Sequence, residues 1–121
     1  MRHPVLHFEV VGRDKDSLVR FYRELFEWEI QDASVPGVEY ALVPRDGDHI
    51  GGGIGATSQG DGHVTWYVGV ADVEAALQKA EELGGRRVMG PESPAPGTTI
   101  GLFRDPEGHL IGVTGDGGAE S

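Results

Sequence analysis

Short apolar runs and two amphipathic segments alternate along the chain. Between residues 6 and 11 apolar and polar side chains alternate, which predicts a strand with Phe8 on one face and His7 and Glu9 on the other. After Asp14, a residue type common at helix starts, apolar side chains recur at three- and four-residue spacing. This spacing predicts an amphipathic helix directly after the first strand.

Three further strands are expected before the middle of the chain: one that opens at Trp28 and Ile30, one over residues 38–43 and one over residues 50–54. The last of them contains the glycine run Gly51–Gly53, which weakens the strand pattern. Residues 55–62 combine glycine with small polar side chains and carry no periodicity. They are therefore expected to form a linker.

The second half repeats this order. The expected elements are a strand over residues 65–70, a helix over 73–83 ended by Gly84-Gly85, a strand from Val88, a proline-rich loop over 91–97 and a hairpin over 100–113 turning at Asp105–Gly108. Residues 116–121 are expected to form a disordered tail.

The two halves align at one constant offset. Pairing His7 with Thr65 also pairs Phe8 with Trp66, and further apolar and acidic positions coincide along the two helices. So many ordered matches indicate one duplication rather than a solenoid, which needs three or more repeats. The expected fold is a single α+β domain of two tandem βαβββ modules, with module one over about residues 5–55, the linker over 55–62 and module two over 63–114.

The composition excludes several classes of protein. At 121 residues and 12.9 kDa the chain fits one domain. It has no cysteine, which excludes disulfides, thiolate zinc sites and cysteine nucleophiles. No apolar run approaches the roughly 18 residues of a membrane span, so a soluble, cytoplasmic protein is expected.

Charge narrows the class of partner. The formal net charge is −10 and the pI is about 4.7. An acidic chain disfavours nucleic acid, whose phosphates repel it, and favours a neutral or cationic small-molecule ligand. The acidity is equally consistent with a role in solubility alone.

Seven short motifs have an order and spacing that resemble one known family. They are His7-Phe8-Glu9, Phe21-Tyr22, Phe26-Glu27-Trp28, Gly51-Gly52-Gly53-Ile54, Val70-Ala71-Asp72-Val73, Gly84-Gly85 and Asp105-Pro106-Glu107-Gly108. Over about residues 5–114 the chain resembles the glyoxalase, bleomycin-resistance and extradiol dioxygenase superfamily, also called vicinal oxygen chelate proteins. The resemblance implies two βαβββ modules whose curved mixed sheet forms a cup around a ligand site, commonly within a homodimer.

The resemblance also bears on metal binding. Metal-dependent members carry four ligand positions on the first and last strands of the modules, and these match His7, Gly52, Thr65 and Gly112. Only His7 can ligate well, whereas a catalytic divalent metal takes about three ligands from His, Asp or Glu. No metal or other cofactor is therefore expected, and His7 is the one matched position that can serve if a divalent metal binds.

A different ligand set stays open. Strand alternation puts Glu9 on the same face as His7, and two imidazoles with a carboxylate, from His7, Glu9 and His63, form an accepted ligand set for a divalent metal. The competing interpretation of His63 is a solvated residue at the edge of the linker.

The glycines at the last-strand positions indicate space for a ligand instead of a metal. Gly52 and Gly112 carry no side chain and leave an approachable backbone. Alternation from Thr65 adds His63 and Tyr67 to one face. The expected ligand-binding residues are Tyr40, Gly52, His63, Thr65, Tyr67 and Gly112. His7 and Glu9 are the candidates for acid–base catalysis, although Glu9 can equally face solvent.

The remaining aromatic and histidine side chains are assigned structural places. Phe8 and Trp66 are expected to pack beneath the helices of their own modules. The expected aromatic core is Phe8, Phe21, Phe26, Trp28 and Trp66. His3, His49 and His109 have no partner at ligand spacing and are expected at the surface.

Two functions are consistent with these observations. The first is a metal-free small-molecule-binding protein that sequesters a drug or metabolite, as the bleomycin-resistance branch of the family does. The alternative is a lyase, isomerase or epimerase that uses His7 and Glu9, with or without a divalent metal. The glycine-lined site favours the first function, and His7 is the main support for the second.

Overall fold

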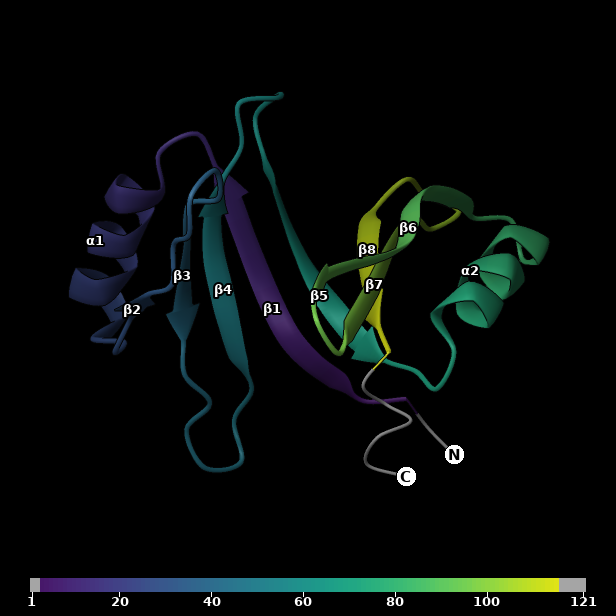
Figure 1. The fold of residues 1–121 in the computed structure, drawn as a ribbon, viewed down its shortest axis with the longest axis horizontal. Helices are drawn as coiled ribbons and strands as arrows, with labels where there is room; N and C mark the ends of the chain where they lie inside the picture. The colour runs from purple at the N-terminus through teal and green to yellow at the C-terminus, as the bar shows by residue number, and fades with distance from the viewer. Residues whose placement is uncertain (1–2, 116–121) are drawn as a thin grey trace. The chain divides into compact units, whose positions relative to one another are not determined.

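The computed structural model describes residues 3–115, which group into two compact units (Figure 1). One unit covers residues 7–64, and the other combines residues 3–6 with residues 65–115. The expected disordered tail, residues 116–121, lies outside the described residues. Neither helix within residues 3–115 is long and apolar enough to cross a membrane.

The unit of residues 7–64 follows the order βαβββ. It contains most of β1 (Val5–Gly12), then α1 (Lys15–Phe26), β2 (Gln31–Asp32), β3 (Tyr40–Val43) and β4 (Gly51–Ala56). Its strands lie in the order β2-β3-β4-β1, and only the pair of β4 and β1 is parallel. Figure 1 shows α1 beside β3 and β4, which it contacts.

Local contacts explain where α1 begins and ends. The Asp14 carboxylate accepts a hydrogen bond from the Ser17 backbone N–H at 3.0 Å, which caps the first turn. At Glu27 the backbone enters the left-handed region, with φ of 58°, and the helix stops. The inner face of α1 buries Val19 in a core with Ile30, Ala41, Val43 and Ile54, against which Phe8, Leu18, Tyr22 and Trp28 pack.

The second unit repeats the βαβββ order. Its elements are β5 (His63–Gly69), whose first two residues belong to the other unit, α2 (Val73–Glu82), β6 (Arg86–Ala95), β7 (Thr98–Arg104) and β8 (Leu110–Thr114). The strands lie in the order β5-β8-β7-β6, with only β5 and β8 parallel. The start of the chain joins this unit, because the Gly69 N–H donates to the Pro4 carbonyl at 2.8 Å.

The α+β class and the repeated order of elements are confirmed, but three expected boundaries are wrong. The strand expected to open at Trp28 and Ile30 begins only at Gln31, as β2, and β4 continues to Ala56, into the expected linker. The expected proline-rich loop over 91–97 is mostly strand, since β6 continues to Ala95. Its pairing with β7 is irregular in register, and such irregular positions tolerate prolines that donate no ladder hydrogen bond.

The expected aromatic core is partly wrong. Phe8 and Trp28 pack on the core of the first unit, but Phe21, Phe26 and Trp66 are 57%, 51% and 48% exposed. The apolar surface of α1 is wider than the part that the sheet covers. In the second unit the core is built by Val70, Val73, Leu77 and Val113 without Trp66.

Candidate functional site

Four polar side chains of the unit of residues 7–64 form one hydrogen-bonded cluster. The Tyr40 hydroxyl on β3 donates to Glu9 Oε2 on β1 at 3.1 Å and lies 3.3 Å from His7 Nε2. His63, at the start of β5, lies with its Nε2 3.2 Å from Glu9 Oε1. The Glu9 side chain is only 15% exposed and that of His63 29%. The structure therefore brings together His7, Glu9, Tyr40 and His63, here called the Glu9 cluster.

Glycines of β4 allow Tyr40 to reach β1. Gly53 pairs with Glu9 and Gly55 pairs with Tyr40, so the tyrosine must cross β4 to meet the glutamate. A Cβ atom on Gly53 would overlap the Tyr40 hydroxyl, and one on Gly55 would lie 3.0 Å from Tyr40 Cδ1. The glycine run therefore leaves the surface over which the Tyr40 ring lies. The run is visible in the sequence, but no sequence pattern indicated this role for Gly53.

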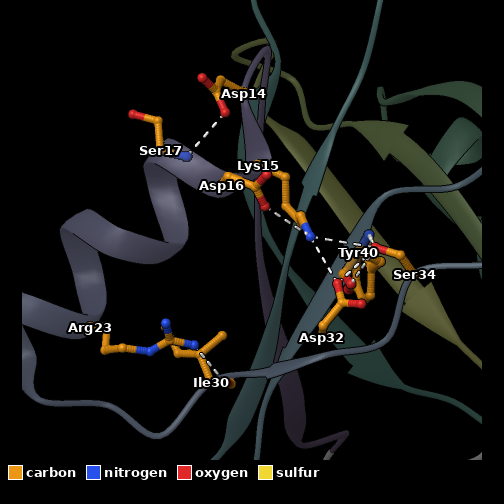
Figure 2. A network of polar contacts seen from close by, with 9 residues as sticks. All are labelled: Asp14, Lys15, Asp16, Ser17, Arg23, Ile30, Asp32, Ser34 and Tyr40. Atoms are coloured by element: carbon orange, nitrogen blue, oxygen red, sulfur yellow. Dashed lines mark hydrogen bonds and ion pairs between the residues drawn. The ribbon is translucent and has the colours of Figure 1, made fainter.

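A second network holds the backbone of Tyr40, as Figure 2 shows. The Tyr40 N–H donates to Ser34 Oγ at 3.0 Å, and that hydroxyl lies 2.9 Å from Asp32 Oδ1. Lys15 Nζ contacts Asp32 Oδ1 at 2.8 Å and Asp16 Oδ1 at 3.1 Å. Hydrogen bonds to Asp32 and Asp16 raise the pKa of the Lys15 ammonium. This network ties the first turn of α1 to the start of β3, and no sequence motif indicated it.

Burial sets the charge of His7. Desolvation lowers the pKa of His7 below its ordinary value, and the nearby charge of Glu9 opposes this effect only in part. The imidazole is therefore neutral near pH 7. A neutral imidazole beside a carboxylate can accept a proton or a hydrogen bond.

Gly52 does not lie beside His7 and Glu9, so its expected place in the site is wrong. Its Cα pairs with Phe8, and a Cβ atom there would fall within the Phe8 ring. Because strand side chains alternate, Gly51 and Gly53 share the face of His7 and Glu9. Gly52 faces the ring that packs on the core of this unit.

The expected site residues Thr65, Tyr67 and Gly112 belong to the other unit. Thr65 and Tyr67 are buried, and Thr65 Oγ1 donates to the Leu110 carbonyl at 2.6 Å. Gly112 pairs with Tyr67, and a Cβ on Gly112 would lie 2.5 Å from the Tyr67 ring. The expected open space at Gly112 is therefore wrong, because the Tyr67 ring fills it.

The residues at the family's metal positions do not fit a metal. Gly52 and Gly112 offer no donor atom, and aromatic rings occupy the space that a side chain would need. Thr65 is engaged with a carbonyl, and His7 with Tyr40. Within residues 3–115 no three His, Asp or Glu side chains are placed so that they can hold a metal ion. That finding includes the alternative set of His7, Glu9 and His63.

The other histidines lie apart from this cluster. His3 and His49 are exposed, as expected. His109 is exposed but has an acidic partner, contrary to expectation, since its Nδ1 lies 3.1 Å from Asp105 Oδ2. This contact closes the turn between β7 and β8.

A groove of about 660 Å³ runs along α2 in the second unit. Apolar side chains such as Ala76, Ala80 and Phe103 line most of it, and His3 and Lys79 also belong to its lining. None of the expected site residues lines this groove.

Comparisons with known proteins agree with this fold. The family model that matches, over residues 5–113, is the Glyoxalase/Bleomycin resistance protein/Dioxygenase superfamily. No curated protein matches the chain significantly in sequence.

Solved structures resemble the chain at low sequence identity. A hypothetical protein from Bacillus halodurans C-125 is 16% identical with a TM-score of 0.69, and the alignment covers 94% of each chain. Methylmalonyl-CoA epimerase from Mycobacterium tuberculosis is 16% identical with a TM-score of 0.66, covering 91% of this chain and 85% of the epimerase. A methylmalonyl-CoA epimerase in complex with methylmalonyl-CoA and NH4+ is 20% identical with a TM-score of 0.63, covering 94% of each chain. These similarities show a shared fold. Because the family match spans residues 5–113, the chain belongs to the Glyoxalase/Bleomycin resistance protein/Dioxygenase superfamily.

Proposed function

We propose that this protein binds a small neutral or cationic molecule at the Glu9 cluster without a metal ion. The observation that carries the proposal is the Glu9 carboxylate, 15% exposed and held between Tyr40 and His63. A partly buried carboxylate interacts more strongly with a cation or a hydrogen-bond donor than an exposed one. The net charge of −10 attracts cations over a longer range.

A thermal-shift panel tests this proposal. Matched sets of amines, neutral amides and carboxylates of similar size are added to the purified protein, and Tm is recorded. A ligand that binds the folded state at one hundred times its Kd stabilises that state by about 2.7 kcal/mol. We expect amines or amides to raise Tm and carboxylates to leave it unchanged.

Two variants locate the effect. Glu9→Gln keeps the shape of the side chain and removes its charge, so it should abolish the shift that an amine produces. Glu92→Gln, an exposed residue of β6, is the matched control and should retain it. A panel without any stabilising member, or an amine shift that survives in Glu9→Gln, would contradict the proposal.

A second candidate is proton-transfer chemistry of the lyase, isomerase or epimerase kind. It is favoured by His7, whose lowered pKa leaves a neutral imidazole joined through Tyr40 to Glu9. The fold shared with methylmalonyl-CoA epimerases is compatible with it. The strongly negative chain disfavours an anionic CoA ester as substrate.

Solvent deuterium exchange separates the two candidates. The protein is incubated in D2O with methylmalonyl-CoA and with neutral carbonyl compounds, and loss of the proton next to the carbonyl is followed by NMR. Exchange that disappears in His7→Gln or Glu9→Gln would favour the enzyme. Binding without exchange would favour the binding protein.

The homodimer and the cytoplasmic location also remain proposals. Exposed apolar side chains on both units, among them Phe21, Leu25, Trp66 and Leu83, support association of two chains. Light scattering of the eluting protein should give twice the chain mass of 12.9 kDa. A mass of one chain at micromolar concentration would argue against the dimer.

A further inference from the structure

The groove along α2 has small side chains where the first unit has large ones. In the first unit Leu18 and Tyr22 of α1 pack against the core, and the Tyr22 ring stacks with that of Trp28. At the constant offset of the sequence repeat, the α2 equivalents of Leu18 and Tyr22 are Ala76 and Ala80, and both alanines line the groove. The second unit therefore lacks one aliphatic and one aromatic side chain here, and the space along this face of α2 stays open.

The groove has the size and the lining of a small-molecule site. Its volume is about 660 Å³, within the range of about 300–1,000 Å³ that is typical of ligand pockets. The alanines of α2 form one side, and Val68 of β5, Phe103 of β7 and Val113 of β8 form the other. At the C-terminal end of α2 the lining residue Leu83 is 70% exposed. A ligand with an apolar body would bury this surface, which favours binding.

The charges of the lining distinguish between classes of ligand. The carboxylates of Asp72 and Asp105 accept hydrogen bonds from backbone N–H groups, at 3.0 Å and 2.9 Å. Within residues 3–115 the Lys79 ammonium has no hydrogen-bond or ion-pair partner. The two carboxylates and the net charge of −10 disfavour an anionic ligand, and the ammonium disfavours a cationic one. An ammonium beside an apolar surface instead attracts the electron-rich face of a neutral aromatic ring.

We propose that the groove along α2 is a second binding site, which takes a flat, neutral aromatic molecule of the phenol or indole class. The ring lies between α2 and the strands, in contact with Ala80 and Phe103, and turns one face toward Lys79. No residue of the Glu9 cluster lines the groove. The proposal therefore goes beyond the proposed function, and neither depends on the other.

Calorimetric titration of the full chain with 2-naphthol, which is neutral at pH 7, tests the proposal. Its saturated counterpart, decahydro-2-naphthol, is similar in size but has no aromatic face. Ala80→Tyr gives α2 the residue of the first unit and fills the groove. Gln78→Tyr is the matched control, because it adds the same ring at an exposed position of α2 that does not line the groove. Lys79→Gln removes the ammonium.

We expect 2-naphthol to bind saturably to the wild type and to Gln78→Tyr but not to Ala80→Tyr. Lys79→Gln should weaken its binding about two- to fivefold, the usual size of a cation–π contact at an exposed site. The wild type should prefer 2-naphthol over the saturated compound, and this preference should narrow in Lys79→Gln. In NMR spectra 2-naphthol should shift the ring signals of His3, which lines the groove, and leave those of His63 unchanged.

Several results would overturn the proposal. They are an absence of binding to the wild type, unchanged binding in folded Ala80→Tyr, and shifts at His63 without shifts at His3. If Ala80→Tyr does not fold, an unchanged affinity in Lys79→Gln would overturn it. A wild type that elutes at twice 12.9 kDa, with Ala80→Tyr eluting as a single chain, would show that a second copy covers the groove and would also overturn it.

Discussion

Glycine at position 112 makes room for an aromatic ring rather than for a ligand. A Cβ atom there would lie 2.5 Å from the Tyr67 ring, which is itself buried. Gly112→Ala should therefore lower the free energy of unfolding by about 1–3 kcal/mol, the usual cost of overpacking. Urea denaturation measures this change.

Two further variants sharpen that prediction. In Gly115→Ala the nearest atom would lie 3.3 Å from the new Cβ. This variant should therefore lower the free energy of unfolding less than Gly112→Ala does. In a Tyr67→Leu background the loss of unfolding free energy caused by Gly112→Ala should be smaller, because positions 67 and 112 are in contact and their effects are coupled. Equal costs in both backgrounds would show that Tyr67 is not the reason for the glycine.

His7 should make stability depend on pH. Burial lowers its pKa in the folded state, whereas the unfolded chain keeps the ordinary value of 6.5. As pH falls through 6.5 the unfolded state takes up a proton before the folded state does, so the free energy of unfolding decreases.

Denaturation curves between pH 8 and pH 5 test this dependence. In His7→Gln the free energy of unfolding should depend less on pH than in the wild type. His49→Gln, at an exposed position, should keep the wild-type pH dependence. A His7→Gln protein with the wild-type pH dependence would contradict the assigned burial effect.

The sequence predicted which residues belong to the Glu9 cluster but not the contacts between them. Alternation along β1 placed His7 and Glu9 on one face, and both belong to the cluster. The partners Tyr40 and His63 were candidates, but their contacts to Glu9 depend on strand register, which periodicity does not determine. Register also explains the error at Gly52, because a shift of one residue moves a position to the opposite face.

At the scale of elements, α2 and β6 are joined by an ion pair. Arg87 on β6 contacts Glu74 on α2 through two nitrogen–oxygen distances of 2.9 Å. Hydrogen bonds from Arg87 and Gln78 lower the pKa of Glu74 to about 2. As pH falls below 4.5 the unfolded carboxyl is protonated first, so the contribution of this pair to stability is lost between about pH 4.5 and 2.

Glu74→Gln should therefore destabilise the protein at pH 7 and do so much less at pH 3. Urea midpoints at the two pH values check this, with Glu82→Gln at the exposed end of α2 as the control. An equal loss at both pH values would mean that the amide is harmful for reasons other than charge.

The sequence repeat predicted both helices but not how much apolar surface each helix buries. Asp14 and Asp72 occupy equivalent positions, and each caps its helix through a backbone N–H at 3.0 Å. At the offset that pairs these caps, Tyr22 of α1 corresponds to Ala80 of α2. The ring of Tyr22 stacks with that of Trp28 at a centroid distance of 5.7 Å, whereas Ala80 lines the groove along α2. Helix periodicity reports which face is apolar, and side-chain volume decides whether that face is filled.

For the whole molecule, the resemblance drawn from motif order is confirmed by the family match over residues 5–113. The same family includes metal-dependent members, yet the matched positions of this chain do not fit a metal. Fold membership alone therefore does not decide the chemistry. The Glu9 cluster supports recognition by charge and hydrogen bonding instead.

The five histidines provide the most direct test of that account. His7 and His63 belong to the Glu9 cluster, His3 lines the groove along α2, and His49 and His109 lie elsewhere on the surface. Ring signals of all five are followed by NMR while the amine or amide that stabilises the protein most is titrated in. The account predicts that the signals of His7 and His63 shift while the others stay. Shifts confined to His3 would place the ligand in the α2 groove and contradict it.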